Sequence, residues 1–235
     1  MSYLPAGLRL EPTTIGRVAA AVVFDMDGVI VDTEQVWDAV REELVADWGG
    51  TSTAGAQRAM MGMSSHEWSL YMHKQLGLPQ SPAEINDEVV QRMLVRYRSE
   101  LPLVEGAIDA VRELAARMPL AVASSSNRPL IEAVLEAAGI AGCFTATISS
   151  EEVPHGKPSP DVYLEAARRL GVAPGHCAAV EDSASGIRAA HAAGMHVIAY
   201  PNMHYPPEAD ALELADIVIP SLAALVPTID DARTT

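Results

Sequence analysis

Short apolar runs recur along the chain, and segments with a helical period of polar and apolar residues separate them. A short apolar run followed by a helix-like segment is typical of a buried strand in a parallel sheet. Six such runs predict strands, at Val18–Phe24, Leu120–Ala123, Thr145–Ile148, Cys177–Val180, His196–Ala199 and Ile217–Ile219. Helical periodicity predicts helices at Ala107–Arg117, Pro129–Ala138, Asp161–Leu170 and Ala184–Ala193. This alternation predicts an α/β fold with a doubly wound parallel sheet.

The alternation is interrupted after the first predicted strand. Residues 34–100 show one helical pattern after another and no strand pattern. We interpret this segment as an all-α helical cap domain inserted into the chain. The α/β catalytic core then consists of residues 15–33 and 101–235.

The composition is that of a globular protein with a strongly acidic charge. Of the 235 residues, 49% are apolar and 20% are charged, which suffices for a sizeable core. The formal net charge of −15 argues against nucleic acid or an anionic membrane as a partner, because polyanions are repelled at long range. A small phosphorylated substrate remains compatible if the site supplies positive charge locally.

Cysteine usage and hydropathy bear on the cellular compartment. Cys143 and Cys177 lie outside any C-x-x-C or Cys/His cluster, which disfavours a zinc site or a disulfide framework. No signal-peptide pattern is present, and no apolar run reaches the roughly 18–20 residues that span a bilayer. We therefore expect a soluble, cytoplasmic protein. A monomer is favoured, and no residue pattern decides the oligomeric state.

Polar side chains follow four of the predicted strands. They are Asp25 and Asp27 after the first strand, Ser124 after the second, Lys157 in the loop after the third, and Glu181 and Asp182 after the fourth. Each has an ordinary structural explanation, such as a turn, a helix N-cap or a surface lysine. Those explanations are independent of one another and do not predict that all four features meet at one edge of the sheet, where open α/β sheets bind ligands.

The residue types at this edge predict phosphoryl transfer. Several carboxylates in one place require a cation or a shared proton. A set of oxygen ligands without His or Cys suits Mg²⁺, which binds a few carboxylates, waters and substrate phosphate. Lys157 and the serine hydroxyls can then hold phosphoryl oxygens. One carboxylate can attack phosphorus, while Asp27 supplies and removes protons.

Four segments carry a family resemblance, in the order FDMDGVIVDTE, VASSSN, GKPSPDVY and VEDSASGIRAAHAAGM. They resemble the four motifs of the haloacid dehalogenase-like superfamily of Mg²⁺-dependent phosphohydrolases, and the resemblance covers nearly the whole chain. The chain is most similar to the branch with a helical cap after the first motif. That branch includes beta-phosphoglucomutase, phosphoglycolate phosphatase and the sugar-phosphate phosphatases.

The resemblance implies roles for the acidic residues. Asp25 would be the nucleophile that forms an aspartyl-phosphate, and Asp27 would be the general acid and base. Mg²⁺ would be bound by the Asp25 carboxylate, the Asp27 backbone carbonyl and Asp182. Glu181 would be a further ligand or an outer partner of the metal site.

The resemblance also implies which residues bind the transferred group. Ser124 and the backbone of Ser125 would bind the phosphoryl group, and Lys157 would bridge that group and Asp25. The expected activity is hydrolysis of a small phosphorylated metabolite, such as a sugar phosphate. Trp37, Arg58, Met61, Met63 and His66 are the candidate substrate contacts in the cap.

Alternative activities are weighed by the residues that they need. Dehalogenases and phosphonatases of this superfamily lack the second aspartate, which is present here as Asp27. A beta-phosphoglucomutase-type isomerase carries a cap histidine and a cap arginine where this chain has Trp37 and Ser65, although His66 is next to Ser65. A non-catalytic phosphate-binding protein would have a degraded motif, and all four are intact. We therefore expect a phosphatase, with the isomerase as the main alternative.

Overall fold

The computed structural model describes residues 19–60, 63–202 and 205–234, and they contain a parallel sheet. Its strands are β1 (Ala21–Phe24), β2 (Leu120–Ser124), β3 (Ala146–Ser149), β4 (Cys177–Glu181), β5 (His196–Ala199) and β6 (Ile217–Val218). The strand order is β3-β2-β1-β4-β5-β6, with every neighbouring pair parallel. This order is that of a doubly wound sheet and confirms the predicted fold class.

The predicted element bounds shift by a few residues. β1 begins later than predicted, because pairing starts where Ala21 lies opposite Cys177; Val18 lies outside the described residues. β3 begins one residue later than predicted, at Ala146, and extends to Ser149. Apolar periodicity does not locate these ends, since they depend on where the neighbouring strands begin to pair.

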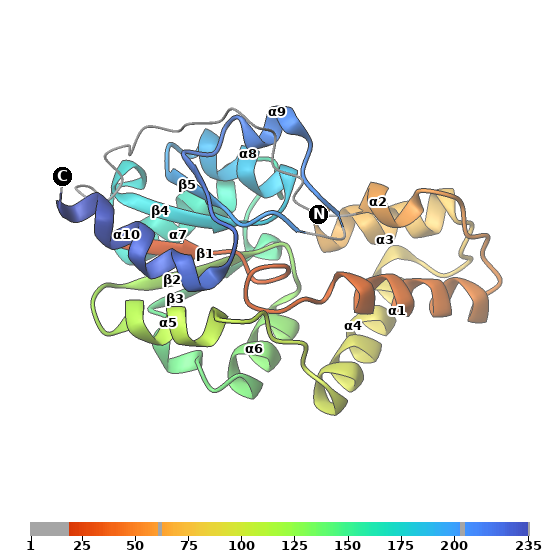
Figure 1. The fold of residues 1–235 in the computed structure, drawn as a ribbon. Helices are drawn as coiled ribbons and strands as arrows, with labels where there is room; N and C mark the ends of the chain where they lie inside the picture. Colours follow the sequence, from red (N-terminus) through yellow and green to blue (C-terminus); the bar gives the residue numbers. More distant parts are fainter. Residues whose placement is uncertain (1–18, 61–62, 203–204, 235) are drawn as a thin grey trace.

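Helices cover both faces of the sheet (Figure 1). Alternate residues of β1 point to opposite faces, and Val22 and Phe24 join a different apolar cluster from Ala21 and Val23. On the Val22 side lie α5 (Ala107–Ala115), α6 (Arg128–Ala137) and α10 (Leu225–Thr234). On the Ala21 side lie α7 (Asp161–Leu170) and α8 (Ala184–Ala192). The short α9 (Ala209–Leu212) and α10 were not predicted from the sequence.

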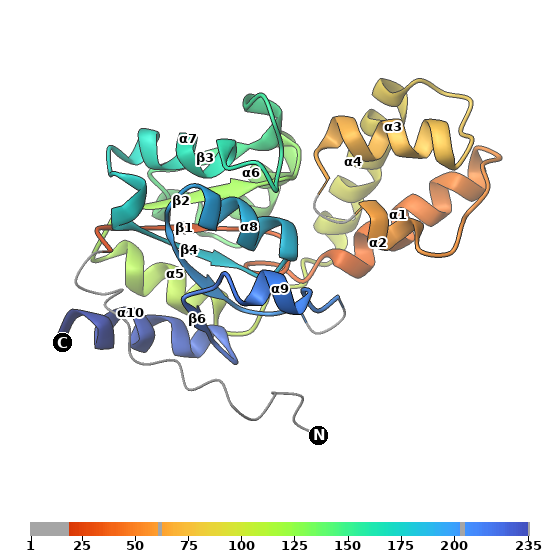
Figure 2. The ribbon, with the colours of Figure 1, turned by 90° about the horizontal axis from the view of Figure 1, so that it is seen from above.

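The segment between β1 and α5 forms helices, and the described residues in 34–100 contain no strand. The helices are α1 (Glu34–Asp47), α2 (Ala56–Met60), α3 (Ser65–Gln75) and α4 (Pro82–Ser99). Ser64 and Ser81 cap α3 and α4 through reciprocal hydrogen bonds with Glu67 and Glu84. Figures 1 and 2 show the four helices grouped at one end of the molecule. The boundaries of this insert as a domain stay a prediction.

The two connections between insert and core lie side by side. The amide of Asp32 donates to the Pro102 carbonyl at 2.7 Å, and the amide of Val104 donates to the Ile30 carbonyl at 3.0 Å. The chain therefore leaves the core and returns to it at one place, next to the end of β1. Single-turn 3₁₀ helices complete the fold, at Ala141–Cys143, Ser150–Glu152, Pro174–His176 and Leu222–Ala224.

Polar contacts join the insert to the core. Ser65 Oγ donates to Glu151 Oε1 at 3.1 Å, and Asn127 Nδ2 donates to Asn86 Oδ1 at 2.9 Å. These contacts place the insert over the carboxyl ends of the strands. Among the described residues, none of the helices combines the length and the apolar character needed to cross a bilayer.

Candidate active site

The acidic residues meet where the strand order reverses, between β1 and β4. Asp25 directly follows β1, and Asp182 directly follows β4, whose Val180 lies opposite Phe24. The carboxyl ends of adjacent parallel strands at this point form the usual binding crevice of an open α/β sheet. The structure thus brings the predicted residues of the first and fourth motifs together.

Lys157 lies between two carboxylates. Its Nζ is 2.9 Å from Asp25 Oδ1 and 2.6 Å from Glu181 Oε1. Glu181 is held by further donors: the hydroxyl of Tyr163 at 2.5 Å, and the amide of Asp182 at 3.1 Å. The lysine is 5% exposed, so the alternative explanation of Lys157 as a surface lysine is wrong.

Electrostatics at the site reflect an excess of buried negative charge. Burial raises the pKa of Asp25 to about 8, aided by Glu181 and Asp27 and opposed by Lys157. Burial, with Glu181 and Asp25, also raises the pKa of Asp182 well above its usual range. Burial alone would lower the pKa of Lys157, but the two carboxylates beside it outweigh burial and raise it. When all of these carboxyl groups are ionised, they carry more negative charge than the lysine compensates.

Gly28 makes room for the Asp182 carboxylate. A Cβ at position 28 would lie 1.8 Å from Asp182 Oδ2, and the residue has a φ of +82°, which side chains disfavour. The turn is closed by the Gly28 amide, which donates to the Val31 carbonyl at 2.7 Å. The first motif therefore needs glycine here both for its turn and for the approach of Asp182.

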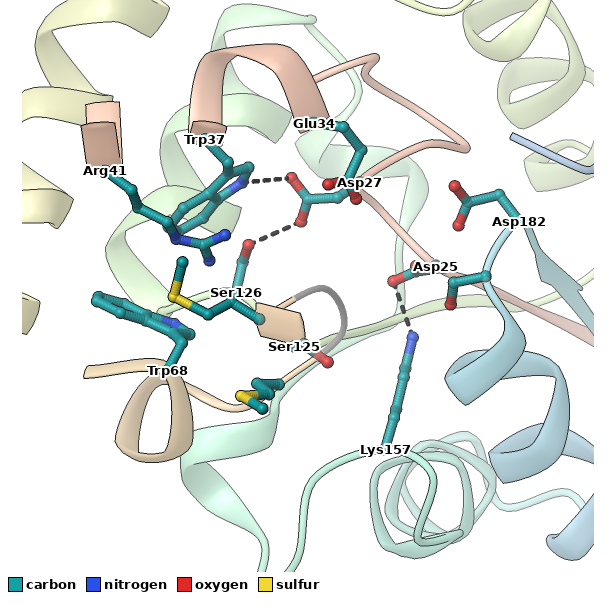
Figure 3. A pocket seen from close by; sticks show the side chains of 13 residues that line it. Asp25, Asp27, Glu34, Trp37, Arg41, Trp68, Ser125, Ser126, Lys157 and Asp182 are labelled. Carbon is teal, nitrogen blue, oxygen red and sulfur yellow. Dashed lines mark hydrogen bonds and ion pairs between the residues drawn. The ribbon is translucent and has the colours of Figure 1, made fainter. Parts of the chain in front are cut away.

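Asp27 points towards the insert rather than towards Asp25 (Figure 3). Its carboxylate accepts hydrogen bonds from Thr33 Oγ1 at 2.5 Å, Trp37 Nε1 at 3.2 Å and Ser126 Oγ at 2.7 Å. Two of these donors lie on the segment that enters the insert, and the third follows β2. Asp27 is therefore held by both parts of the molecule.

The serines after β2 lie at two depths in the site. Ser124 is fully buried, and its Oγ accepts from the Ser126 amide at 3.0 Å and lies 3.5 Å from Asp27 Oδ2. The pocket itself is lined by Ser125 and Ser126. The structure thus places the predicted Ser124 at the floor of the site and brings Ser126, which was not predicted, into it.

Residues of the insert form the opposite wall of the pocket. They are Glu34, Trp37, Arg41, Met60, Met63 and Trp68. Among the predicted cap contacts, Trp37 and Met63 line the pocket. Arg58 and His66 are exposed, and Met61 lies outside the described residues.

Sequence reasoning missed Glu34 and Arg41. They lie three residues before and four residues after Trp37, a spacing that places all three on one face of a helix. That spacing was available in the sequence. What it could not show is that this face turns towards the core.

Comparisons with known proteins agree with the geometry. A family model described as haloacid dehalogenase-like hydrolase matches residues 19–194. The chain belongs to this hydrolase family. It is 35% identical over 184 residues to fructose-1-phosphate phosphatase YqaB of Escherichia coli strain K12, covering 76% of this chain and 95% of that protein. It is 33% identical to hexitol phosphatase B of the same strain, covering 89% and 95%.

A solved structure of the family has the same architecture. The structure of CbbY from Rhodobacter sphaeroides in complex with phosphate superposes with a TM-score of 0.80 at 27% identity, covering 90% of this chain and 99% of that one. The haloacid dehalogenase-like resemblance and its fold are therefore confirmed.

Proposed function

We propose that this protein is a Mg²⁺-dependent phosphatase that hydrolyses a small phosphate monoester through a phosphorylated Asp25. The observation that carries the proposal is the Asp25 carboxylate, held by Lys157 at 2.9 Å beside the acidic cluster at the switch point of the sheet. The named phosphatases among its relatives support hydrolysis. The two free cysteines support a reducing, cytoplasmic location.

The acidic cluster fits a divalent cation. One oxygen from each of Asp25, Glu181 and Asp182 lies within 4.8 Å of the others. Asp182 is buried, and among the described residues its side chain accepts a hydrogen bond only from Asn202 Nδ2, at 3.1 Å. A carboxylate that is buried with so little compensation favours a bound cation.

The ligand set differs in one respect from the set that the resemblance implies. Both oxygens of Glu181 already accept hydrogen bonds. We therefore assign Mg²⁺ to Asp25, Asp182 and the Asp27 carbonyl, and assign Glu181 to the positioning of Lys157. Bound there, Mg²⁺ would neutralise the carboxylates and polarise the phosphoryl oxygens.

In the first step, Asp25 attacks phosphorus. Lys157 fixes Oδ1, and among the described residues Oδ2 has no hydrogen-bond donor, so it is available as the nucleophile. A bond forms between this oxygen and phosphorus as the bond to the leaving oxygen breaks. Asp27, in its protonated form, gives its proton to the leaving oxygen, and an alcohol departs. Lys157 would neutralise charge on the phosphoryl oxygens, and Ser125, which lines the pocket, would orient them, with Ser124 buried behind it.

In the second step, water attacks the phosphorus of the aspartyl-phosphate. Asp27, now a carboxylate, takes a proton from this water as the bond between phosphorus and Asp25 breaks. Inorganic phosphate leaves, the Asp25 carboxylate is restored, and Asp27 is again protonated. The insert covers the pocket during both steps and limits the access of bulk water.

The isomerase alternative finds no support in the pocket. The position of the cap arginine is Ser65, which is buried and bonded to Glu151. His66 is exposed, so a shift of one residue does not bring a polar side chain into the pocket. At the position of the cap histidine, Trp37 donates to Asp27.

The test is hydrolysis of para-nitrophenyl phosphate with Mg²⁺ and with excess chelator. We expect activity that chelator removes and Mg²⁺ restores, and a loss of about 10³-fold or more in Asp25→Asn. Asp109→Asn, at an exposed position on α5, is the matched control and should keep wild-type activity. Activity that persists in Asp25→Asn or in chelator overturns the mechanism.

A further inference from the structure

The insert carries a buried cation that has no hydrogen-bond or ion-pair partner among the described residues. Arg41 of α1 is 6% exposed and lines the pocket opposite the acidic cluster (Figure 3). Its Nε is buried and has no acceptor. Because a buried N–H without an acceptor is unfavourable, such a donor at a pocket wall points to an oxygen of the ligand.

Two indole rings hold this guanidinium. Its central carbon lies 4.7 Å from the ring centre of Trp37 and 5.3 Å from that of Trp68. The Trp37 N–H is engaged by Asp27, so only its ring contacts the arginine. Stacking of this kind stabilises a guanidinium without using its N–H groups. Those groups are therefore oriented and available to a ligand.

A carboxylate two turns before the arginine on the same helix also lines the pocket. Glu34 lies on the same face of α1, is half-buried, and makes no hydrogen bond to a described residue. In its ionised form Glu34 has only acceptors, whereas Arg41 has only donors. A hydroxyl group is both donor and acceptor, so this pair matches a compound with several hydroxyl groups.

The charges around the pair disfavour a second phosphate. Among the described lining residues the cations are Lys157 and Arg41, while the acids are Asp25, Asp27, Glu34 and Asp182. Lys157 is engaged with Asp25 and Glu181. A second phosphate at Arg41 would lie close to Glu34 with no further cation to offset the repulsion. A neutral leaving group meets no such repulsion.

We propose that Arg41 and Glu34 form a subsite for hydroxyl groups, so that the substrate is a monophosphate of a neutral polyhydroxylated compound, a sugar or a sugar alcohol, rather than a bisphosphate. This subsite rests on the proposed phosphatase function and specifies its substrate class. Trp68, Met60 and Met63 supply apolar surface for the carbon skeleton beside it.

The experiment compares kcat/KM with Mg²⁺ for three kinds of substrate. They are para-nitrophenyl phosphate, which lacks hydroxyl groups; the better of fructose 1-phosphate and a hexitol monophosphate; and xylulose 1,5-bisphosphate. The proteins are the wild type, Arg41→Met, Arg41→Lys, Glu34→Gln and the control Arg98→Met, at an exposed position of α4. The ratio of two kcat/KM values from one preparation does not depend on what fraction of the protein is folded, so incomplete folding of a variant does not affect the comparison.

We expect the wild type to favour the polyhydroxylated monophosphate over the bisphosphate by about tenfold or more. In Arg41→Met, the ratio of kcat/KM for the polyhydroxylated monophosphate to kcat/KM for para-nitrophenyl phosphate should fall by about 10- to 100-fold. Arg41→Lys and Glu34→Gln should lower the ratio less, and Arg98→Met should not change it. An unchanged ratio in Arg41→Met, or preference for the bisphosphate, overturns the subsite. Wild-type protein that cleaves only para-nitrophenyl phosphate refutes the subsite alone, whereas protein that cleaves none of the substrates refutes the proposed function.

Discussion

The indole Nε1 of Trp37 lies 3.2 Å from Asp27 Oδ1 and donates a hydrogen bond to it. This bond joins the first long helix of the insert to the residue that we propose as acid and base (Figure 3). The position of Asp27 therefore depends on the insert as well as on the end of β1.

Replacing Trp37 with Phe should impair catalysis more than binding. Phe keeps an aromatic ring next to Arg41 and Trp68, although a smaller one than the indole, and it lacks the N–H donor to Asp27. We expect kcat to fall about 10- to 100-fold with little change in KM, because a hydrogen bond to a charged group contributes roughly 1.5–3 kcal/mol. Steady-state kinetics of Trp37→Phe measure the two constants. Trp48→Phe, at a partly buried indole packed on the core, is the control; an equal fall in its kcat would refute the assignment.

Gly28→Ala should disable the acidic cluster. The new methyl group would lie 1.8 Å from Asp182 Oδ2, so the carboxylate or the turn has to move. We expect at least a hundredfold loss of activity and weaker Mg²⁺ binding, because a displaced ligand alters the geometry that the cation needs. Isothermal titration with Mg²⁺ and activity assays test this.

Gly49→Ala is the matched control for the backbone effect. Gly49 has a φ of +75°, and a Cβ there would meet nothing within 4 Å. Both variants place alanine in the left-handed region, at a cost of about 1 kcal/mol. Only Gly28→Ala should lose activity, and comparable losses in the two variants would mean that strain rather than the clash is responsible.

Removing Lys157 should cost stability as well as activity. Lys157→Met leaves Asp25 and Glu181 buried without their cation, and we expect a loss of about 3–5 kcal/mol in the free energy of unfolding. The double variant Lys157→Met with Glu181→Gln has one unpaired charge fewer. It should recover part of that stability but none of the activity. Urea unfolding of the two single variants and the double variant gives the coupling. Lys74→Met, at an exposed lysine of α3, should match the wild type; equal effects at the two lysines would contradict the structure.

Glu34 should make stability depend on pH. Burial, with Asp27, raises its pKa to about 7, so the folded protein keeps this proton at a pH where the unfolded chain has lost it. Wild-type stability should therefore fall as pH rises from about 4.5 to about 7 and stay lower above that range.

The variant Glu34→Gln isolates this contribution. It should be more stable than the wild type by about 1–3 kcal/mol at pH 8, with the difference vanishing towards pH 4.5. Denaturant unfolding at pH 5 and pH 8 measures both. Glu42→Gln, exposed on the same helix, should keep the wild-type dependence on pH. A difference between Glu34→Gln and wild type that is the same at both pH values would contradict the burial of this carboxyl.

The gathering of the candidate site residues at one edge of the sheet was predictable, because parallel strands bring their carboxyl ends together. That rule places Asp25, Lys157 and Asp182 near one another from strand and loop positions alone. The rule does not say which carboxylate the lysine approaches, and only the structure shows that it contacts both Asp25 and Glu181. Such pairings depend on rotamers and on loop geometry.

The insert was predicted as helical, but its contribution to the pocket was not. Helical periodicity identifies an apolar face without saying which other face turns to the core. Arg41 has the spacing of the buried face of α1, but a charged residue type is not expected there, and it lies buried between Trp37 and Trp68. Its burial depends on the tertiary packing that brings Trp37 of α1 next to Trp68 of α3. The role of Ser124 in binding the phosphoryl group stays a prediction. Its full burial, with Ser125 and Ser126 lining the pocket, follows from the course of the loop after β2 and could not be predicted from the sequence.

The nucleophilic role of Asp25 is tested most directly by the stereochemistry at phosphorus. The substrate is a thiophosphate monoester that is chiral at phosphorus because one of its oxygens is a heavy isotope. It is hydrolysed in water enriched in the other heavy isotope of oxygen, and the configuration of the released thiophosphate is determined. Attack by Asp25 followed by attack by water is two in-line displacements, each of which inverts phosphorus. The mechanism predicts net retention of configuration; net inversion would mean that water attacks the substrate directly and would contradict it.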